Sequence, residues 1–276
     1  MRVRLISFSL LLTLLWPGLT YAAEGPQYYL ALGDSLAVGI QPNFNGTLVE
    51  TNQGYVDDLY GFYRHSAPGL RLKKLGCSGE TTTTMIIGHS CSYAHGNQLD
   101  EAVAFLQTHR VALVTLDIGG DDVLHCFSLS GPSPGCLDAG VFAVTVNLPI
   151  ILAALHDAAP GVPIVAMNYY DPFLAAWQLG PAGQTIAQES LAATVGFNGI
   201  LQGIYQWFGI PVADVAAAYH IANFTPVPAL GVPLNVFLAL ALTWIRAPPP
   251  VGPDIHPNAF GYAVIAGAFV KAIGAP

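Results

Sequence analysis

Short apolar runs rich in β-branched residues alternate along the chain with longer segments of helical periodicity. The short runs predict strands over 28–32, 70–75, 111–118, 164–169 and, at the edge of the sheet, 210–214. The periodic segments predict helices over 56–63, 98–107, 141–157, 184–208 and 258–273. Strands that alternate with helices favour a mostly parallel sheet with helices on both faces. The sequence therefore predicts an α/β fold, a three-layer α/β/α sandwich.

The first residues have the pattern of a secretory signal peptide. Arg2 and Arg4 precede the apolar run 5–16, and Thr20-Tyr21-Ala22 supplies small residues at the −3 and −1 positions of a cleavage site. The run is short for a transmembrane helix, so a retained membrane anchor is the weaker alternative. We expect residues 1–22 to be removed on secretion.

A second apolar run covers residues 229–245. It contains Pro233 and Asn235, and only Arg246 follows it as a flanking cation, which is atypical of a transmembrane helix. We interpret this run as a buried or substrate-facing helix. Residues 23–276 then form one domain, a length that single domains commonly reach.

The composition excludes several classes of protein. Charged residues make up 9 % of the chain and hydrophobic residues 53 %, which is incompatible with a disordered chain. The formal net charge of −8 argues against a nucleic-acid partner, because a phosphate backbone requires a basic face.

Four cysteines, at positions 77, 91, 126 and 136, form an even set in a secretory context and predict two disulfides. Of the three possible pairings, the local one joins Cys77 to Cys91 and Cys126 to Cys136. No Cys or His spacing typical of zinc is present, so we expect no metal. Asp117, Asp121, Asp122 and His125 could together suggest a cation site. The better explanation is that Asp117 and Asp122 form hydrogen bonds with neighbouring loops.

In a parallel sheet, ligands bind at the carboxyl ends of the strands. The chemically informative loops there are 33–36, 76–80, 119–122 and 254–258. Ser35 follows a predicted strand, where a serine acts as a nucleophile if a base accepts its proton; alternatively, Ser35 or Asp34 caps a following helix. Among eight histidines, His256 is the best candidate for the base, and Asp254 lies close enough in sequence to orient it.

Together these blocks resemble the GDSL/SGNH hydrolase family. The resemblance rests on Gly33-Asp34-Ser35-Leu36, a glycine after the second strand, a Gly-x-x-Asp loop after the third, and His256-Pro257-Asn258 near the end. The segment Cys-Ser-Gly-Glu-Thr at 77–81 is similar to the secreted bacterial lipase/esterase branch. The resemblance implies an SGNH-hydrolase-like, flavodoxin-like sandwich that cleaves esters through an acyl-enzyme, without metal or organic cofactor.

The resemblance also implies individual roles. Ser35 is the expected nucleophile, its backbone N–H and that of Gly79 are oxyanion donors, and His256 is the general base. In the family, an Asn side chain is the third oxyanion donor, whereas this chain has Asp121. An ionised carboxylate only accepts hydrogen bonds, so we expect weakened activity unless Asp121 is protonated by burial.

A second departure concerns the group that orients His256. The family usually has Asp-x-x-His, but here Pro253 occupies that position and Asp254 lies two residues before the histidine. Two acceptors therefore remain open for the second ring nitrogen: the Asp254 carboxylate and the Pro253 carbonyl.

The resulting expectation is a secreted, extracellular bacterial serine esterase or lipase. It would act as a monomer on small-molecule or lipid esters, with transient contact with a lipid interface. The alternatives are a weakly active or inactive relative that binds ligands, which Asp121 favours, and a polysaccharide O-acetyl esterase.

Overall fold

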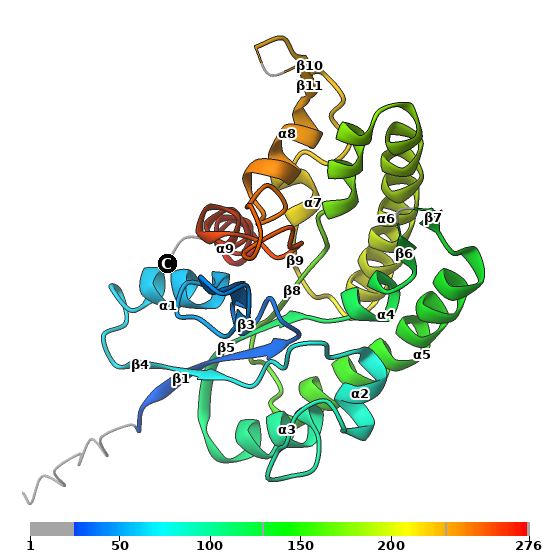
Figure 1. The fold of residues 1–276 in the computed structure, drawn as a ribbon. Helices are drawn as coiled ribbons and strands as arrows, with labels where there is room; N and C mark the ends of the chain where they lie inside the picture. Colours follow the sequence, from blue (N-terminus) through cyan, green and yellow to red (C-terminus); the bar gives the residue numbers. More distant parts are fainter. Residues whose placement is uncertain (1–24, 129, 230, 275–276) are drawn as a thin grey trace, which may run out of the picture.

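The computed structural model describes residues 25–274, apart from residues 129 and 230 (Figure 1). The predicted signal peptide, residues 1–22, lies outside the described residues.

A parallel sheet forms the centre of the described chain (Figure 1). Its strands occur in the order β4-β1-β5-β8-β9, and every neighbouring pair is parallel. The strands are β1 (Gln27–Gly33), β4 (Leu70–Lys74), β5 (Arg110–Asp117), β8 (Ile164–Met167) and β9 (Val212–Ala213). All five strand predictions are confirmed, and the order is that of a flavodoxin-like fold.

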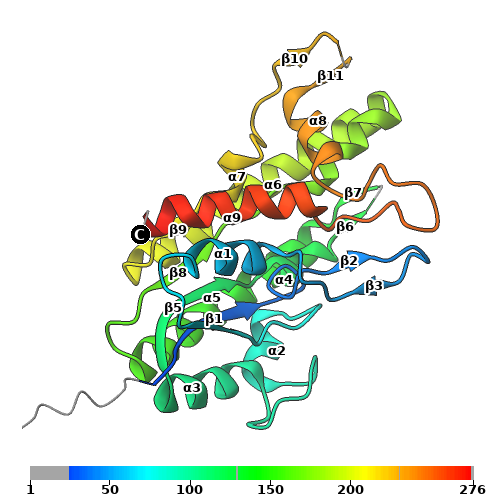
Figure 2. The ribbon, with the colours of Figure 1, turned by 90° about the vertical axis from the view of Figure 1, so that its left-hand side faces the viewer.

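Helices cover both faces of this sheet (Figure 2). Helices α1 (Tyr55–Tyr63) and α9 (Ala259–Ile273) pack together on one face, and α3 (Gln98–Thr108) and α5 (Pro134–Ala158) pack together on the other. Helix α6 (Pro181–Trp207) packs against the 3₁₀ helix η1 (Pro172–Leu179). The predicted three-layer α/β/α architecture is therefore confirmed.

Helix α5 begins earlier than the predicted start at residue 141. Pro134 is its first residue, a position that proline favours because its missing N–H would have no partner in the first turn. By length and composition α5 is apolar enough to cross a membrane. One face, which includes Val144, Leu148 and Leu152, is nevertheless buried within the fold.

Several short elements were not predicted, because they contain too few residues to show a periodicity. They are the helices α2 (Thr82–Ile87), α4 (Gly120–Leu124) and α7 (Val215–Ala218), and the two-stranded hairpins β2 (Gln41–Pro42) with β3 (Leu48–Val49), β6 (Phe127–Ser128) with β7 (Gly131–Pro132), and β10 (Pro226–Val227) with β11 (Val232–Pro233).

The apolar segment 229–245 is only partly helical. Helix α8 (Leu234–Ala241) contributes the buried Val236 and Leu240 and packs against η1. The prediction of a buried helix is confirmed for these eight residues. Residues 242–245, after the helix, approach the segment that precedes α9, since the backbone N–H of Trp244 donates to the His256 carbonyl over 3.1 Å.

Candidate active site

Ser35 lies on a tight turn directly after β1, and this turn is held by β5. The Asp34 N–H donates to the Asp117 carbonyl over 3.1 Å, and the Asp34 carboxylate accepts from the Leu36 N–H over 2.9 Å. Gly33 has φ +137°, and a Cβ there would lie 2.1 Å from the Asp117 carbonyl oxygen, so only glycine allows β1 and β5 to end this closely.

The expectation of a helix after Ser35 is wrong. Residues 35–39 form successive turns, and the Ile40 N–H donates back to the Ser35 carbonyl over 3.0 Å. Asp34 therefore caps a turn rather than a helix. Ser35 is 8 % exposed and is positioned by this turn. Because no helix begins at Ser35, its hydroxyl does not lie in the dipole field of a helix that starts there.

His256 bridges Ser35 and Asp254. Its Nε2 lies 3.0 Å from Ser35 Oγ, and its Nδ1 lies 2.9 Å from Asp254 Oδ1. The same carboxylate oxygen accepts the His256 backbone N–H over 3.0 Å, which fixes the carboxylate against the ring from two directions. Of the two acceptors considered from the sequence, the structure places the Asp254 carboxylate at the second ring nitrogen.

The loop that carries His256 is held at both ends. Thr243 and Pro257 form an antiparallel bridge before and after it. Asn258 caps α9 by accepting from the N–H groups of Phe260 and Gly261, and its side-chain amide donates to the Ala241 carbonyl over 2.8 Å. The His-Pro-Asn block therefore fixes both the histidine and the helix that follows.

Gly79 lies in the loop after β4, at the edge of the same pocket as Ser35. Its φ is +79°, and the space where a Cβ would stand is open. The Cys77 N–H donates to the Gly33 carbonyl over 3.0 Å, which ties this loop to the end of β1. Cys77 is also bonded to Cys91, as the local pairing predicted. The Gly79 N–H is thus held in a loop that is anchored on two sides.

Gln98, which the sequence analysis missed, joins the two loops. This side chain is fully buried; its Oε1 accepts from the Gly33 N–H over 2.7 Å, and its Nε2 donates to the Gly33 carbonyl over 2.9 Å. The same Nε2 lies 3.0 Å from Glu80 Oε2. In the sequence, this role is indicated only by a polar residue, Gln98, at the first position of α3 and on the side of the helix that faces the core.

Asp121 lines the pocket beside Ser35, Gly79 and His256. Burial raises the pKa of its carboxyl to about 6, an effect that the nearby His256 opposes. At neutral pH most molecules therefore present a carboxylate at the position where the family has an amide donor.

Asp122 and Asp117 hold the loops around the site. Asp122 accepts from the backbone N–H and the hydroxyl of Thr82 over 2.8 and 2.6 Å, and so joins α4 to the start of α2. Asp117 accepts from the Tyr55 hydroxyl over 2.7 Å, and burial raises its pKa to about 8. The interpretation of these two aspartates as hydrogen-bonding groups is confirmed.

The pocket has a volume of about 500 Å³ and an apolar wall. Phe127 and Phe173 stack with ring centroids 4.8 Å apart, and the wall continues over residues of α5 and α6, namely Leu137, Val141, Phe197 and Ile200. The described residues of 229–245 do not line it, so the substrate-facing alternative for that segment is wrong.

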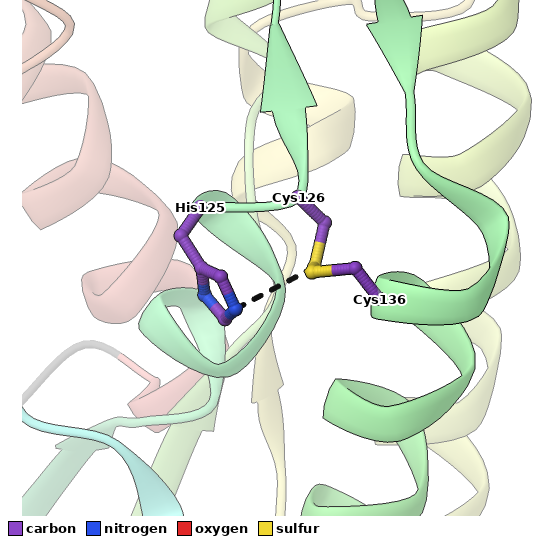
Figure 3. Close-up of side chains that lie close together, drawn as sticks. All are labelled: His125, Cys126 and Cys136. Atoms are coloured by element: carbon purple, nitrogen blue, oxygen red, sulfur yellow. Dashed lines mark hydrogen bonds between the residues drawn. A yellow bond between two sulfur atoms is a disulfide. The ribbon is translucent and has the colours of Figure 1, made fainter.

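The described His and Cys side chains gather most closely at His125, Cys126 and Cys136 (Figure 3). The two cysteines form a disulfide, the second of the predicted pairs, and His125 Nε2 lies 3.8 Å from the Cys126 sulfur. A disulfide sulfur carries no thiolate charge, so this group does not fit a metal.

The fold is similar to that of several solved structures. An extracellular lipase from Streptomyces rimosus superposes with a TM-score of 0.58 at 20 % identity, over 89 % of this chain and 99 % of the lipase. A phospholipase A1 from Streptomyces albidoflavus NA297 superposes with a TM-score of 0.56 at 16 % identity, over 90 % and 100 % of the two chains. An acetylxylan esterase from Geobacillus stearothermophilus superposes with a TM-score of 0.54 at 19 % identity, over 92 % of this chain and 96 % of the esterase.

No curated protein is similar enough in sequence to match. A family model for the GDSL-like Lipase/Acylhydrolase family, in contrast, matches residues 31–264, which include every block discussed above. The protein therefore belongs to the GDSL-like lipase/acylhydrolase family and is an ester hydrolase.

Proposed function

We propose that this protein is a secreted serine esterase or lipase that cleaves carboxylic esters through an acyl-enzyme. The observation that carries the proposal is the chain of contacts Ser35–His256–Asp254, at 3.0 and 2.9 Å, on the edge of an apolar pocket. A nucleophile, a base and a group that orients the base, each within hydrogen-bond distance of the next, are the arrangement that activates a serine.

The reaction follows from these positions. Ser35 Oγ attacks the ester carbonyl while His256 Nε2 accepts its proton, and the Asp254 carboxylate stabilises the imidazolium. The backbone N–H groups of Ser35 and Gly79 donate to the oxyanion. His256 then protonates the leaving alcohol, and a water activated by the same histidine releases the acid.

The apolar wall of the pocket favours an acyl chain longer than acetyl. Burial of a methylene group contributes about 0.8 kcal/mol, so each additional carbon that enters the pocket strengthens binding. This argues for a lipase-like preference and against the removal of acetyl groups from polysaccharides, although solved structures of both kinds share the fold.

Two further parts of the proposal concern the protein's surroundings. Two disulfides are typical of proteins that fold in an oxidising compartment, which supports secretion. Phe142, Val146 and Ile150 form an exposed apolar ridge on α5, which begins one residue after the pocket residue Val141. This ridge supports transient contact of a monomer with a lipid interface.

The test is hydrolysis of a series of p-nitrophenyl esters from acetate to dodecanoate by the mature protein and by Ser35→Ala. We expect activity that rises from acetate to a medium chain and falls at least a thousandfold in Ser35→Ala, about the loss expected when a triad member is removed. Ser133→Ala is the matched control, because Ser133 lies in a Gly-x-Ser-x-Gly sequence but does not line the pocket.

Three outcomes contradict the proposal or a part of it. Equal turnover by wild type and Ser35→Ala excludes the serine mechanism. Binding of esters without Ser35-dependent turnover identifies an inactive ligand-binding relative, the candidate that Asp121 favours. A rate that is highest on acetate excludes the preference for longer chains.

A further inference from the structure

Every strand of the central sheet ends near an acidic residue. Asp34 follows β1, Asp171 follows β8 and Asp214 follows β9. Glu80 lies in the loop after β4, and β5 ends at Asp117 with Asp121 in the loop beyond. Because the strands are parallel, these carboxyl groups gather at one end of the sheet, which is the end that holds the pocket.

The basic residues have a different distribution. Arg110 begins β5, and Arg71 pairs in register with Tyr28 near the beginning of β1. Arg64 caps the end of α1, and Lys271 lies in the last turn of α9. The ends of these two helices meet, since the Tyr63 hydroxyl donates to the Gly274 carbonyl over 3.2 Å. Most of the basic residues that the structure describes therefore lie at the far end of the sheet.

Three other cations lie nearer the pocket end but do not line the pocket. Lys73, in β4, places its Nζ 5.9 Å from the centroid of the Phe105 ring. Lys74 pairs with Asp57 over 2.6 Å, which neutralises its charge locally. Arg246 is exposed on the loop between α8 and His256.

Among the described residues no Lys or Arg lines the pocket, whereas Asp34, Asp121 and Asp138 do. Burial raises the pKa of the Asp34 carboxyl well above its usual value, so the negative charge at the pocket comes from Asp121 and Asp138. Asp138 is exposed at the fifth residue of α5, so its carboxylate faces solvent at the pocket.

We propose that this arrangement selects esters by charge: the site takes esters with a cationic or uncharged alcohol part and rejects those whose alcohol part is anionic. The inference rests on the proposed ester hydrolysis at Ser35 and names its substrate class. A concave site lined by charges of one sign and walled by apolar side chains focuses the field on whatever enters it. An anionic group several ångströms from Asp121 and Asp138 is repelled, and a cationic group is attracted.

The test uses three phenyl hexanoates that carry a trimethylammonio, a nitro or a sulfonate group at the same ring position. For each ester, kcat/KM is measured in low salt at about pH 8, above the pKa of about 6 of Asp121. Each value is divided by the rate constant for hydrolysis of the same ester by hydroxide, so that differences in leaving-group acidity cancel.

We expect the normalised kcat/KM to fall from the cationic to the uncharged to the sulfonate ester, by about tenfold at each step. The differences in normalised kcat/KM among the three esters should become smaller in about 1 M NaCl, where the Debye length is ~3 Å. A spread caused by ring size or shape would not respond to salt.

Two aspartates of α5 provide a matched pair of variants. Asp138→Asn removes a carboxylate at the pocket, and Asp157→Asn removes one at the far end of the same helix, about 28 Å away at 1.5 Å per residue. We expect Asp138→Asn to reduce the ratio between the cationic and the sulfonate ester by about threefold. Asp157→Asn should leave that ratio unchanged.

A sulfonate ester that is cleaved as well as the cationic ester in low salt overturns the proposal. Binding of the same esters to Ser35→Ala, measured by isothermal titration calorimetry, is a second test of charge selection that does not require turnover. If the wild type cleaves none of the esters, the proposed function fails, while the order of the Kd values still supports or refutes charge selection.

Discussion

The side chain of Gln98 bonds both backbone groups of Gly33, accepting from its N–H over 2.7 Å and donating to its carbonyl over 2.9 Å. These residues lie 65 positions apart in the chain, and Gly33 is two residues before Ser35, the proposed nucleophile. Through Glu80 the same amide reaches the loop of Gly79. We therefore expect Gln98 to act as a positioning residue for the proposed nucleophile Ser35 and for Gly79, the proposed oxyanion donor.

Gln98→Glu is predicted to lower kcat by about tenfold to a hundredfold with little change in KM, because a small displacement of a catalytic group impairs the transition state more than substrate binding. The variant replaces a donor with a carboxylate that faces Glu80 and the Gly33 carbonyl. Steady-state kinetics on a soluble ester measure the effect at a temperature where circular dichroism shows the variant folded. Gln107→Glu, on the exposed side of the same helix, is the control. An equal loss in both variants, or a loss confined to KM, contradicts the role.

Asp121→Asn is predicted to raise ester hydrolysis, by an amount that depends on pH. Above about pH 6 the Asp121 carboxylate repels the developing oxyanion, and an amide donor there contributes up to about 10²–10³ in kcat. Below that pH Asp121 is protonated and donates a hydrogen bond itself, so the gain becomes small. The ratio of variant to wild-type kcat should therefore increase between about pH 5 and pH 8. A ratio that stays at or below unity at every pH refutes this account of Asp121.

Asp254→Asn is predicted to lower kcat by about 10²–10⁴, since the amide no longer stabilises the imidazolium and presents a donor to His256 Nδ1 in one of its orientations. The backbone bond to His256 is preserved if the amide oxygen faces it. Asp138→Asn, which also removes an acid at the pocket, controls for the loss of negative charge. Nearly full turnover in Asp254→Asn would mean that the Pro253 carbonyl orients the histidine instead.

Asp171 is predicted to make the free energy of unfolding depend on pH. Burial raises its pKa to about 7, against about 3.9 in an unfolded chain. The folded state therefore binds the proton more tightly, so this contribution to stability is complete below about pH 4 and is lost as the pH rises to about 7.

Asp171→Asn removes this dependence and can retain the bonds to the Ser190 hydroxyl and the Phe173 N–H. Relative to wild type, the variant should gain stability from about pH 5 to pH 8, by at most about 1.4 kcal/mol per pH unit, in urea unfolding experiments. Asp157→Asn, an exposed site, should show no such gain. If the free energies of unfolding of Asp171→Asn and wild type differ by the same amount at about pH 5 and at about pH 8, the prediction is contradicted.

Local sequence determined which segments become strands and long helices. The runs 111–118 and 164–169 are apolar and β-branched, and their side chains favour a buried strand wherever they are placed. The resemblance also placed Ser35 and Gly79 in loops after strands and His256 in the loop before the last helix, because short motifs set local backbone geometry. The pairing of Cys77 with Cys91 and of Cys126 with Cys136 follows equally from short loops, since nearby cysteines meet most easily.

Only the tertiary structure decided the roles that depend on residues distant in the chain. Ser35 and His256 lie 221 positions apart, and no periodicity places Asp254, rather than the Pro253 carbonyl, behind that histidine. The burial of Asp121 and the clamp of Gln98 on Gly33 likewise arise only when separate loops pack together. The physical reason is that propensity acts within a few residues, whereas hydrogen-bond partners and the pKa of a buried carboxyl are set by whatever the fold brings alongside.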